Sequence, residues 1–287
     1  MLVQRITALA WTLSALIAAV HPAAARTDIP VDLELVLAVD ISRSIDEEEA
    51  QMQRAGYRAA LTDPEVMQAI QAGMLGRIAL TYVEWAGEGT QQVIIPWTLI
   101  GTEQDAQGFA DLLAQAPIRF AMWTAIGDAI DFSAALFEAN GFDGTRRVID
   151  VSGDGPSNNG PRVDQARDRA VGAGITINGL PILNDRPSPG GFPGVANLDL
   201  YYGDCVIGGP GAFIVAAQGF EAFGRAIRSK LLLEIAGNDQ IHPRPTFHAL
   251  RAAEFRHSVA AIDAYGATRP DCGWGERQWQ RYFGTQY

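Results

Sequence analysis

Apolar, β-prone runs alternate with amphipathic stretches along most of the chain. The runs are rich in Val, Ile and Leu with little alternation of apolar and polar positions, which is typical of strands covered on both faces. They occupy residues 33–41, 77–85, 92–99, 147–152, 175–183 and 212–216. Helical patterns lie at residues 46–62, 65–72, 103–115, 124–140, 163–173 and 220–236. The alternation predicts a doubly wound, Rossmann-like α/β fold with a mostly parallel sheet and helices on both faces.

One pair of runs departs from this scheme. "RIALTYVEWA" and "QQVIIPWTLI" are separated only by "GEGT", which is too short for a crossover helix. The two runs should therefore form an antiparallel hairpin. Pro96 lies inside the second run and has no N–H for a ladder, so that strand should lie at the edge of the sheet.

The first 25 residues have the features of a secretory signal peptide. Arg5 precedes the apolar segment "ITALAWTLSALIAAV", and "AAA" at 23–25 supplies small residues for cleavage near Ala25. An uncleaved anchor is the alternative interpretation. No Cys stands near the cleavage position, and no later segment is apolar over the length of a membrane span. We therefore expect an exported bacterial protein, periplasmic or secreted, with no membrane insertion after signal cleavage.

The alternating region should form one domain, residues 30–237. It is interrupted at residues 184–211 by a Gly- and Pro-rich insertion with a helical turn around "LDLYYGDC". Residues 238–287 should form a C-terminal extension with a helix at 249–265. Its aromatic end, "CGWGERQWQRYFGTQY", is interpreted either as a docking tail or as a segment packed on the domain.

Composition limits the partners. The chain has 287 residues, 48% hydrophobic, which is enough for a well-buried core. Its formal net charge of −11 makes it a poor candidate for nucleic acid or for anionic membrane surfaces, where basic patches supply the affinity. The only two cysteines, Cys205 and Cys272, predict a disulfide in an oxidising compartment, with two free buried thiols as the alternative.

Small oxygen-bearing side chains follow the ends of two predicted strands. Asp40, Ser42 and Ser44 stand in "LVLAVDISRSIDEEEA", and Asp154 stands in "SGDGPSNNG". Thr124, in "MWTAIGDAI", opens a predicted helix between those strands in sequence. Ligands of open parallel sheets bind at the carboxyl ends of the strands. These are hard oxygen ligands without His or Cys, so they predict a site for Mg²⁺, or for Mn²⁺ or Ca²⁺.

Each of these residues also has a purely structural interpretation. Ser44 and Glu47 match a capping box, and Thr124 could cap its helix. Asp154 begins an Asp-Gly-Pro turn signal. Their joint occurrence at predicted strand ends and helix starts favours the metal site.

The order "DISRS", "TAIGDAI", "SGDG" resembles the von Willebrand factor A domain and its metal-ion-dependent adhesion site. "SGDGPSNN" and "CVIGGPGAF" are similar to stretches of an uncharacterised family of exported bacterial proteins of this type. The resemblance covers residues 33–237. It implies that Ser42 and Ser44 bind the ion directly, Thr124 directly or through water, and Asp40 and Asp154 mostly through water. It also implies an open coordination position that accepts an acidic side chain from a protein partner.

The sequence departs from the commonest pattern of that family at two positions. Trp123 precedes the Thr where Gly is frequent, and Gly153 precedes the Asp where Thr is frequent. Both departures affect the rim of the site and the choice of partner more than they affect metal binding.

The leading functional hypothesis is a non-enzymatic, metal-dependent protein-binding module. One alternative is a metal-assisted hydrolase, but the sequence has no H-E-x-x-H, G-x-S-x-G or phosphate-loop motif. His242, His248 and His257 match no familiar metal spacing. The other alternative is a structural or accessory subunit of an envelope complex.

Overall fold

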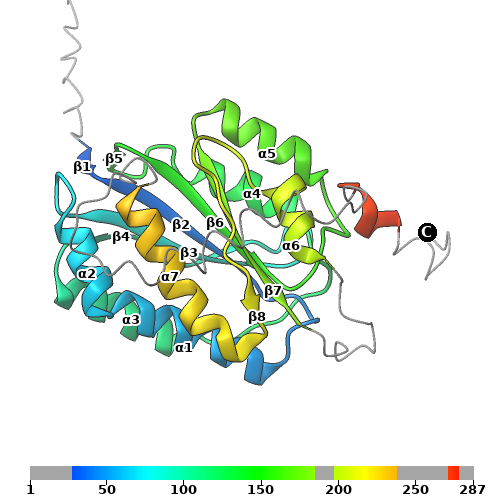
Figure 1. The fold of residues 1–287 in the computed structure, drawn as a ribbon, viewed down its shortest axis with the longest axis horizontal. Coiled ribbons are helices and arrows are strands. Elements are labelled where there is room, and N and C mark those ends of the chain that lie inside the picture. Colours follow the sequence, from blue (N-terminus) through cyan, green and yellow to red (C-terminus); the bar gives the residue numbers. More distant parts are fainter. Residues whose placement is uncertain (1–27, 185–196, 238–270, 278–287) are drawn as a thin grey trace, which may run out of the picture.

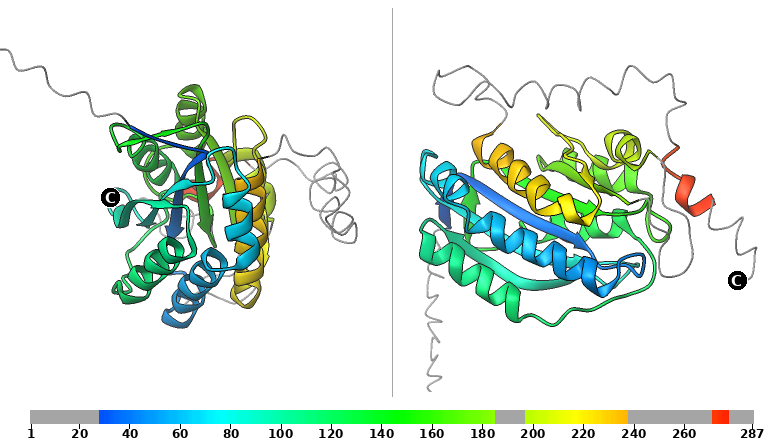
Figure 2. Two further views of the ribbon diagram at one scale, coloured as in Figure 1. Left: turned by 90° about the vertical axis from the view of Figure 1, so that its left-hand side faces the viewer. Right: turned by 60° about the horizontal axis from the view of Figure 1, so that its bottom comes forward.

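The computed structural model describes residues 28–184, 197–237 and 271–277, and within them a six-stranded sheet lies between two layers of helices (Figures 1 and 2). The strands are β1 Ile29–Val31, β2 Leu33–Asp40, β3 Ile78–Trp85, β4 Gln92–Ile100, β5 Phe142–Gly144, β6 Arg147–Gly153, β7 Thr176–Leu183 and β8 Ala217–Gln218. The helices are α1 Glu47–Leu61, α2 Pro64–Gln71, α3 Glu103–Gln115, α4 Ile126–Ala135, α5 Val163–Gly172, α6 Leu198–Tyr201, the π-helical turn η1 Tyr202–Val206, the short 3-10 turn η2 Phe220–Ala222 and α7 Phe223–Ala236.

The strand order is β4-β3-β2-β6-β7-β8, with only the β3–β4 pair antiparallel. The predicted α/β fold and its antiparallel edge strand are therefore confirmed. Pro96 is exposed on the edge strand β4, and the register of the β3–β4 pair shifts beside it. The missing N–H is tolerated because the outer side of an edge strand needs no partner.

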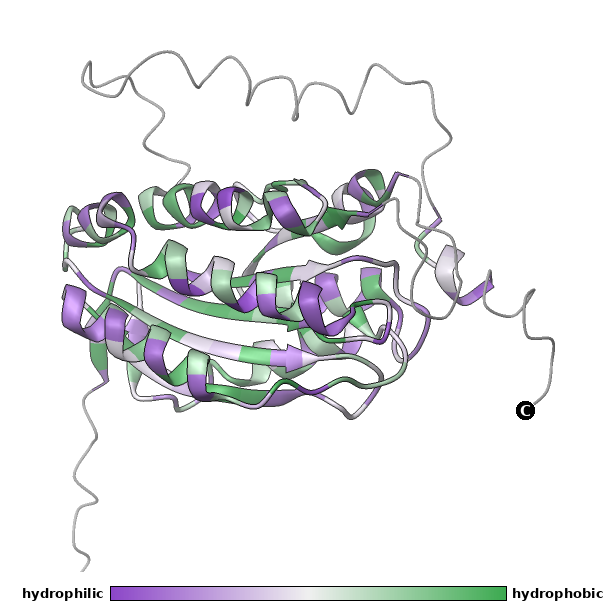
Figure 3. Ribbon diagram, turned by 90° about the horizontal axis from the view of Figure 1, so that it is seen from below, coloured by the Kyte–Doolittle hydropathy of each residue, from purple (hydrophilic) through white to green (hydrophobic). Residues whose placement is uncertain are grey.

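Strand β2 lies at the centre of the sheet, and all eight of its residues are buried. Leu33, Leu35, Leu37 and Val39 pack into the core under α1, α3 and α7. Val36 and Ala38 point to the opposite face, into the core formed with α4 and α5. This two-sided cover explains why the strand sequence is apolar without alternation. Figure 3 shows the complementary pattern in the helices, which carry both hydrophilic and hydrophobic residues.

Some boundaries differ from the predictions. The strand expected at 212–216 is wrong: it makes only a bridge between Ile214 and Gly179, and the strand that pairs with β7 is β8. The helix expected at 124–140 begins at Ile126 and ends at Ala135. It stops early because Ala139 and Gly141 adopt positive φ angles, which a right-handed helix does not allow.

Several predictions lie outside the described residues. They are the signal peptide, the helix at 249–265 and the end of the aromatic tail after Arg277. The domain boundaries also stay a prediction. Within the described part of the chain, none of the helices has the length and apolar character needed to span a bilayer.

Candidate metal centre

The first loop of the site follows directly from the central strand. Asp40 is the last residue of β2 and is fully buried, and its Oδ1 accepts a hydrogen bond of 2.7 Å from the Ser42 backbone N–H. The loop then reaches Asp46, which caps α1 in a capping box with Glu49. The capping interpretation of Ser44 with Glu47 is therefore wrong. The Ser44 hydroxyl is not needed at the helix terminus.

The second loop follows β6, the parallel neighbour of β2, so the ends of the two strands meet. The Ser42 and Ser44 hydroxyl oxygens are 2.8 Å apart, and the Ser44 hydroxyl donates to Asp154 Oδ1 at 2.7 Å. The Ser44–Asp154 hydrogen bond joins residues 110 positions apart in the sequence. The structure thus brings four of the five predicted ligand residues into one connected group.

Thr124, the fifth predicted residue, lies on a third loop between the other two. The Arg43 backbone N–H donates to the Ala121 carbonyl at 3.1 Å, which places this loop beside the first. The Asn158 backbone N–H donates to the Thr124 carbonyl at 2.8 Å, and the Thr124 N–H donates to Asn158 Oδ1 at 2.8 Å. The N-cap of α4 is Ala125, with no side-chain cap, so the capping interpretation of Thr124 is also wrong.

The ionised forms of the two carboxylates of the site, Asp40 and Asp154, are electrostatically disfavoured. Burial, and then the charge of Asp154, raise the pKa of Asp40 well above its ordinary value, while the Ser42 N–H acts in the opposite direction. Burial likewise raises the pKa of Asp154 to about 6, with Glu49 adding to the increase and the Ser44 hydroxyl opposing it. Both shifts have the sign expected where a positive charge is needed and the protein does not supply it.

The donor set fits a hard divalent cation. Asp40 Oδ2 is buried and accepts no hydrogen bond from the part of the chain that the structure describes. Within the described residues, neither Asp40 nor Asp154 forms an ion pair with a basic side chain. Two carboxylates with neighbouring hydroxyls fit Mg²⁺, Mn²⁺ or Ca²⁺. Among those residues no group of three or more His, Cys, Asp or Glu is placed to hold a metal, and the candidate site offers two carboxylates and neighbouring hydroxyls.

Two tyrosines near the site were missed in the sequence. A Cβ atom on Gly153 would lie 2.8 Å from the Tyr202 hydroxyl oxygen and 2.9 Å from Asp40 Oδ2. The neighbouring Tyr201 hydroxyl accepts a hydrogen bond of 3.2 Å from the Ser157 backbone N–H. The glycine at position 153 was the available signal, because Gly in a strand often marks a close approach of another group.

The rim of the site is formed by residues next to the ligand positions. Arg43 is exposed between Ser42 and Ser44, and Met122 is 53% exposed. Trp123 has a φ of +73°, in the left-handed region that favours glycine. The chain therefore keeps a large side chain at the rim in spite of backbone strain, a combination often found at functional sites.

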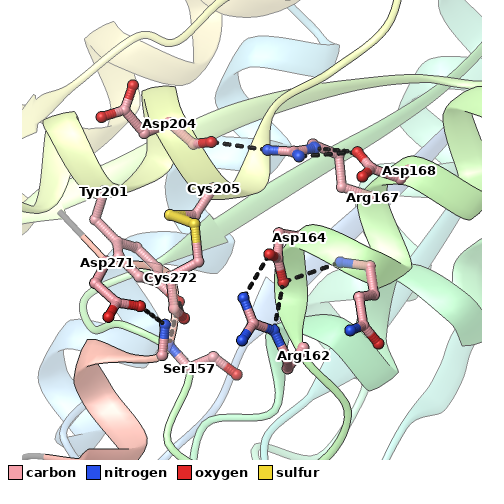
Figure 4. Close-up of a disulfide and its surroundings, with 12 residues drawn as sticks. Ser157, Arg162, Asp164, Arg167, Asp168, Tyr201, Asp204, Cys205, Asp271 and Cys272 are labelled. Carbon is pink, nitrogen blue, oxygen red and sulfur yellow. Dashed lines mark hydrogen bonds and ion pairs between the residues drawn. A yellow bond between two sulfur atoms is a disulfide. The ribbon is translucent and has the colours of Figure 1, made fainter. Parts of the chain in front are cut away.

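The predicted disulfide is confirmed and lies beside the second loop (Figure 4). Cys205 of η1 is bonded to Cys272, which holds residues 271–277 against the domain. A Cβ atom on Gly275 would lie 2.1 Å from the Ser157 carbonyl oxygen, so this segment packs directly on the loop that follows Asp154. The described start of the aromatic tail is therefore packed on the domain.

Comparisons with known proteins agree with this architecture. The family model described as "Protein of unknown function (DUF1194)" matches residues 30–239. None of the curated proteins matches the chain. Proximal thread matrix protein 1 (PTMP1) from the mussel byssus is 14% identical, with a TM-score of 0.53 over 73% of this chain and 49% of that one. The pilus adhesin SpaC from Lactobacillus rhamnosus GG is 13% identical, with a TM-score of 0.52 over 73% of this chain and 31% of that one.

A von Willebrand factor type A protein from Catenulispora acidiphila is 13% identical, with a TM-score of 0.48 over 71% of this chain and 43% of that one. At such identities, PTMP1 and SpaC show a shared fold and nothing further. This chain spans about half the length of PTMP1 and less than a third of SpaC.

Proposed function

The chain belongs to the DUF1194 family and has the von Willebrand factor A-type fold; from this premise we propose that its metal centre binds a divalent cation and, once loaded, an acidic side chain of a protein partner. The observation that carries the proposal is the connected group of Ser42, Ser44 and Asp154. Its hydroxyl and carboxylate oxygens, from strand ends 110 residues apart, lie within hydrogen-bond distance. Asp40 adds a buried oxygen that has no hydrogen-bond partner among the described residues.

The chemistry of the donors explains why a partner carboxylate would bind. Ser42, Ser44 and Thr124 offer neutral hydroxyls, and only Asp40 and Asp154 offer charge. A divalent ion held by such a set keeps enough positive charge to attract a further carboxylate. Mg²⁺ is the first candidate, with Mn²⁺ and Ca²⁺ as alternatives, because all three prefer oxygen ligands.

The rim supports a protein partner. Arg43 places an exposed positive charge beside the site in a chain whose formal net charge is −11. Met122 adds exposed apolar surface at the same edge. A partner with an acidic residue flanked by apolar side chains is complementary to both features.

An exported location and a non-enzymatic role complete the proposal. The disulfide supports an oxidising compartment, where such bonds persist. PTMP1 is named as a matrix protein and SpaC as a pilus adhesin, which agrees with binding as the role of this fold. The metal-assisted hydrolase has no supporting observation at this site.

Metal binding is tested by calorimetric titration of Mg²⁺ and Mn²⁺ into the metal-stripped protein without its predicted signal peptide, residues 26–287. We expect one site in the wild type and no binding in Ser42→Ala or Asp154→Ala. Ser133→Ala is the matched control, because it removes a buried serine hydroxyl on α4 that does not belong to the site. Equal binding by the Ser42→Ala and Ser133→Ala proteins would contradict the proposal.

Recognition of a carboxylate is tested separately on the Mn²⁺-loaded protein. A short peptide with a central Asp should displace water from the ion and lower the water-proton relaxation enhancement. The same peptide with Asn in place of Asp, and with both termini blocked, is the control. An equal response to the two peptides would contradict a site for acidic side chains while leaving metal binding intact.

A further inference from the structure

Tyr202 occupies a slot that is formed by two glycines on neighbouring strands. A Cβ atom on Gly179 of β7 would lie 2.8 Å from Tyr202 Cδ1, and one on Gly153 of β6 would lie 2.8 Å from its hydroxyl oxygen. Any other residue at either position would displace the ring or its hydroxyl. Glycine weakens a strand interior, so its presence at both positions indicates that the close approach of Tyr202 is a built feature.

The end of this slot is the metal centre. The point over Gly153 that lies 2.8 Å from the Tyr202 hydroxyl lies 2.9 Å from Asp40 Oδ2, so the two oxygens face the same small space. Both atoms are fully buried, and neither has a hydrogen-bond partner in the described residues. A buried hydroxyl and a buried carboxylate oxygen left unpaired are each costly, and here the two lie together.

Charge and protonation suit a donor–acceptor relation between the two groups. A tyrosine hydroxyl has an ordinary pKa of about 10, so it is protonated at neutral pH and can donate a hydrogen bond. Asp40 Oδ1 is already occupied by the Ser42 N–H, so Oδ2 is the acceptor that is free.

We propose that Tyr202 is a positioning residue of the metal centre, whose hydroxyl faces Asp40 Oδ2 across Gly153 and orients the Asp40 carboxylate for the ion. The inference rests on the proposed function, because it assigns a role toward the ion that the site is proposed to hold.

The position of Tyr202 in the chain explains how this role is supported. Tyr202 opens the π-helical turn η1, which also contains Cys205. The disulfide to Cys272 anchors that turn, and Tyr201 holds the loop after Asp154 through the Ser157 N–H. The insertion at residues 184–211 therefore places the Tyr202 hydroxyl at the site, although it lies far along the chain from Ser42.

The test compares Tyr202→Phe with the wild type in two measurements, Mn²⁺ affinity by calorimetry and urea unfolding in EDTA. Loss of an outer-sphere partner should weaken Mn²⁺ binding by roughly tenfold or more. Stability in EDTA should be unchanged or higher, because an unpaired buried hydroxyl has been removed. Tyr82→Phe is the matched control: it removes another buried, unpaired tyrosine hydroxyl, on β3, and should leave the affinity unchanged.

Gly153→Ala provides an independent variant. Its Cβ atom would lie 2.8 Å from the Tyr202 hydroxyl oxygen and 2.9 Å from Asp40 Oδ2, so it would displace at least one of them and should also weaken Mn²⁺ binding. Wild-type affinity in Tyr202→Phe would overturn the positioning role and leave the proposed function standing. Absence of binding in the wild type would overturn both. Lower stability of Tyr202→Phe with unchanged affinity would show that the tyrosine acts only in packing.

Discussion

Strand β6 and the loop that follows it each contribute an acid to a carboxylate pair, and the charges of the two pairs are balanced in different ways. Asp150, in the middle of the strand, lies with Glu234 of α7 around Lys230, whose Nζ is 2.6 Å from Asp150 Oδ1 and 2.5 Å from Glu234 Oε1. Asp154, just after the strand, lies with Asp40 among serine hydroxyls and has no such lysine. The interior supplies its own cation at the first pair and none at the second.

The difference follows the position of each pair in the fold. Lys230 and Glu234 come from α7, which covers the middle of the sheet, and Asn178 of β7 donates to Glu234 Oε1 at 3.0 Å. Each of these four residues, Asp150 included, has an exposed fraction of 2% or less. The Asp40–Asp154 pair lies at the carboxyl edge, where Asp154 is partly exposed. A cation can arrive from solution only at the edge, so only the edge pair can serve as a binding site.

The largest effect should come from removal of the internal cation. Lys230→Met leaves two buried carboxylates without a counter-charge and should lower the free energy of unfolding by about 3–5 kcal/mol, measured by urea unfolding. The triple variant Lys230→Met, Asp150→Asn, Glu234→Gln has no buried charge at this position and should recover most of the loss. A Lys230→Met protein as stable as the wild type would show that the lysine does not balance these acids.

The next effect should come from supplying the cation that the edge pair lacks. Mg²⁺ at 100 times its dissociation constant should stabilise the wild type by about 2.7 kcal/mol relative to EDTA. Ser44→Ala should gain nothing, because it removes the hydroxyl that joins the first loop to Asp154. Thermal unfolding at matched ionic strength measures the difference, and an equal gain in both proteins would indicate nonspecific binding.

The pH dependence should separate the two groups further. Burial, and then Glu234, raise the pKa of Asp150 to about 7, while Lys230 acts in the opposite direction. Among the described residues, Tyr57 and Tyr202 also interact electrostatically with Asp150. Between about pH 4 and 7 the folded state binds a proton that the unfolded state has lost, so stability should fall as the pH rises, by at most about 1.4 kcal/mol per pH unit.

Asp150→Asn lacks this carboxyl group and keeps the Lys230–Glu234 pair. Its stability in EDTA relative to the wild type should therefore increase from pH 5 to pH 7 and level off above that. Asp143→Asn, at an exposed position, is the control and should show no trend. A constant difference between Asp150→Asn and the wild type would mean that Asp150 is ionised throughout this range.

The smallest effect should be a gain in stability at the edge. Asp154→Asn removes one of two uncompensated carboxylates and should stabilise the metal-free protein by about 1 kcal/mol while abolishing metal binding. Urea unfolding in EDTA measures the gain. A loss of stability would indicate that Asp154 acts mainly as an acceptor for Ser44, and Asp154→Ala would then be the less stable of the two variants.

The sequence was sufficient for the layout of the fold because each strand carries its own signal. The uninterrupted apolar run of β2 indicated burial on both faces, and Pro96 indicated the edge strand. Short or irregular elements were not predictable in the same way. The 212–216 run contacts β7 only at Ile214, and the small β1–β5 sheet depends on a pairing between residues more than 100 positions apart.

The same distinction holds at the site. Asp40, Ser42 and Ser44 were recognisable because their spacing is local, and a parallel sheet brings Asp154 to them. Tyr202 was not recognisable, because its place depends on a π-helical turn within the Gly- and Pro-rich insertion and on the absence of side chains at Gly153 and Gly179. The buried group of Asp150, Lys230 and Glu234 was not predicted for a similar reason. Asp150 and Lys230 belong to elements whose relative register is not specified by any local sequence pattern.

Because Ser44 and Asp154 are far apart in the chain, the site can form only late in synthesis and folding. Synthesis at roughly 5–20 residues per second separates the two residues by roughly 5–20 s, and β6 must pair with β2 before the loops meet. The candidate metal centre is therefore incomplete in the nascent chain until Asp154 has been translated. If the site holds the proposed ion, it can do so only after the sheet has formed, so the metal supply of the compartment where folding ends would decide which cation is bound.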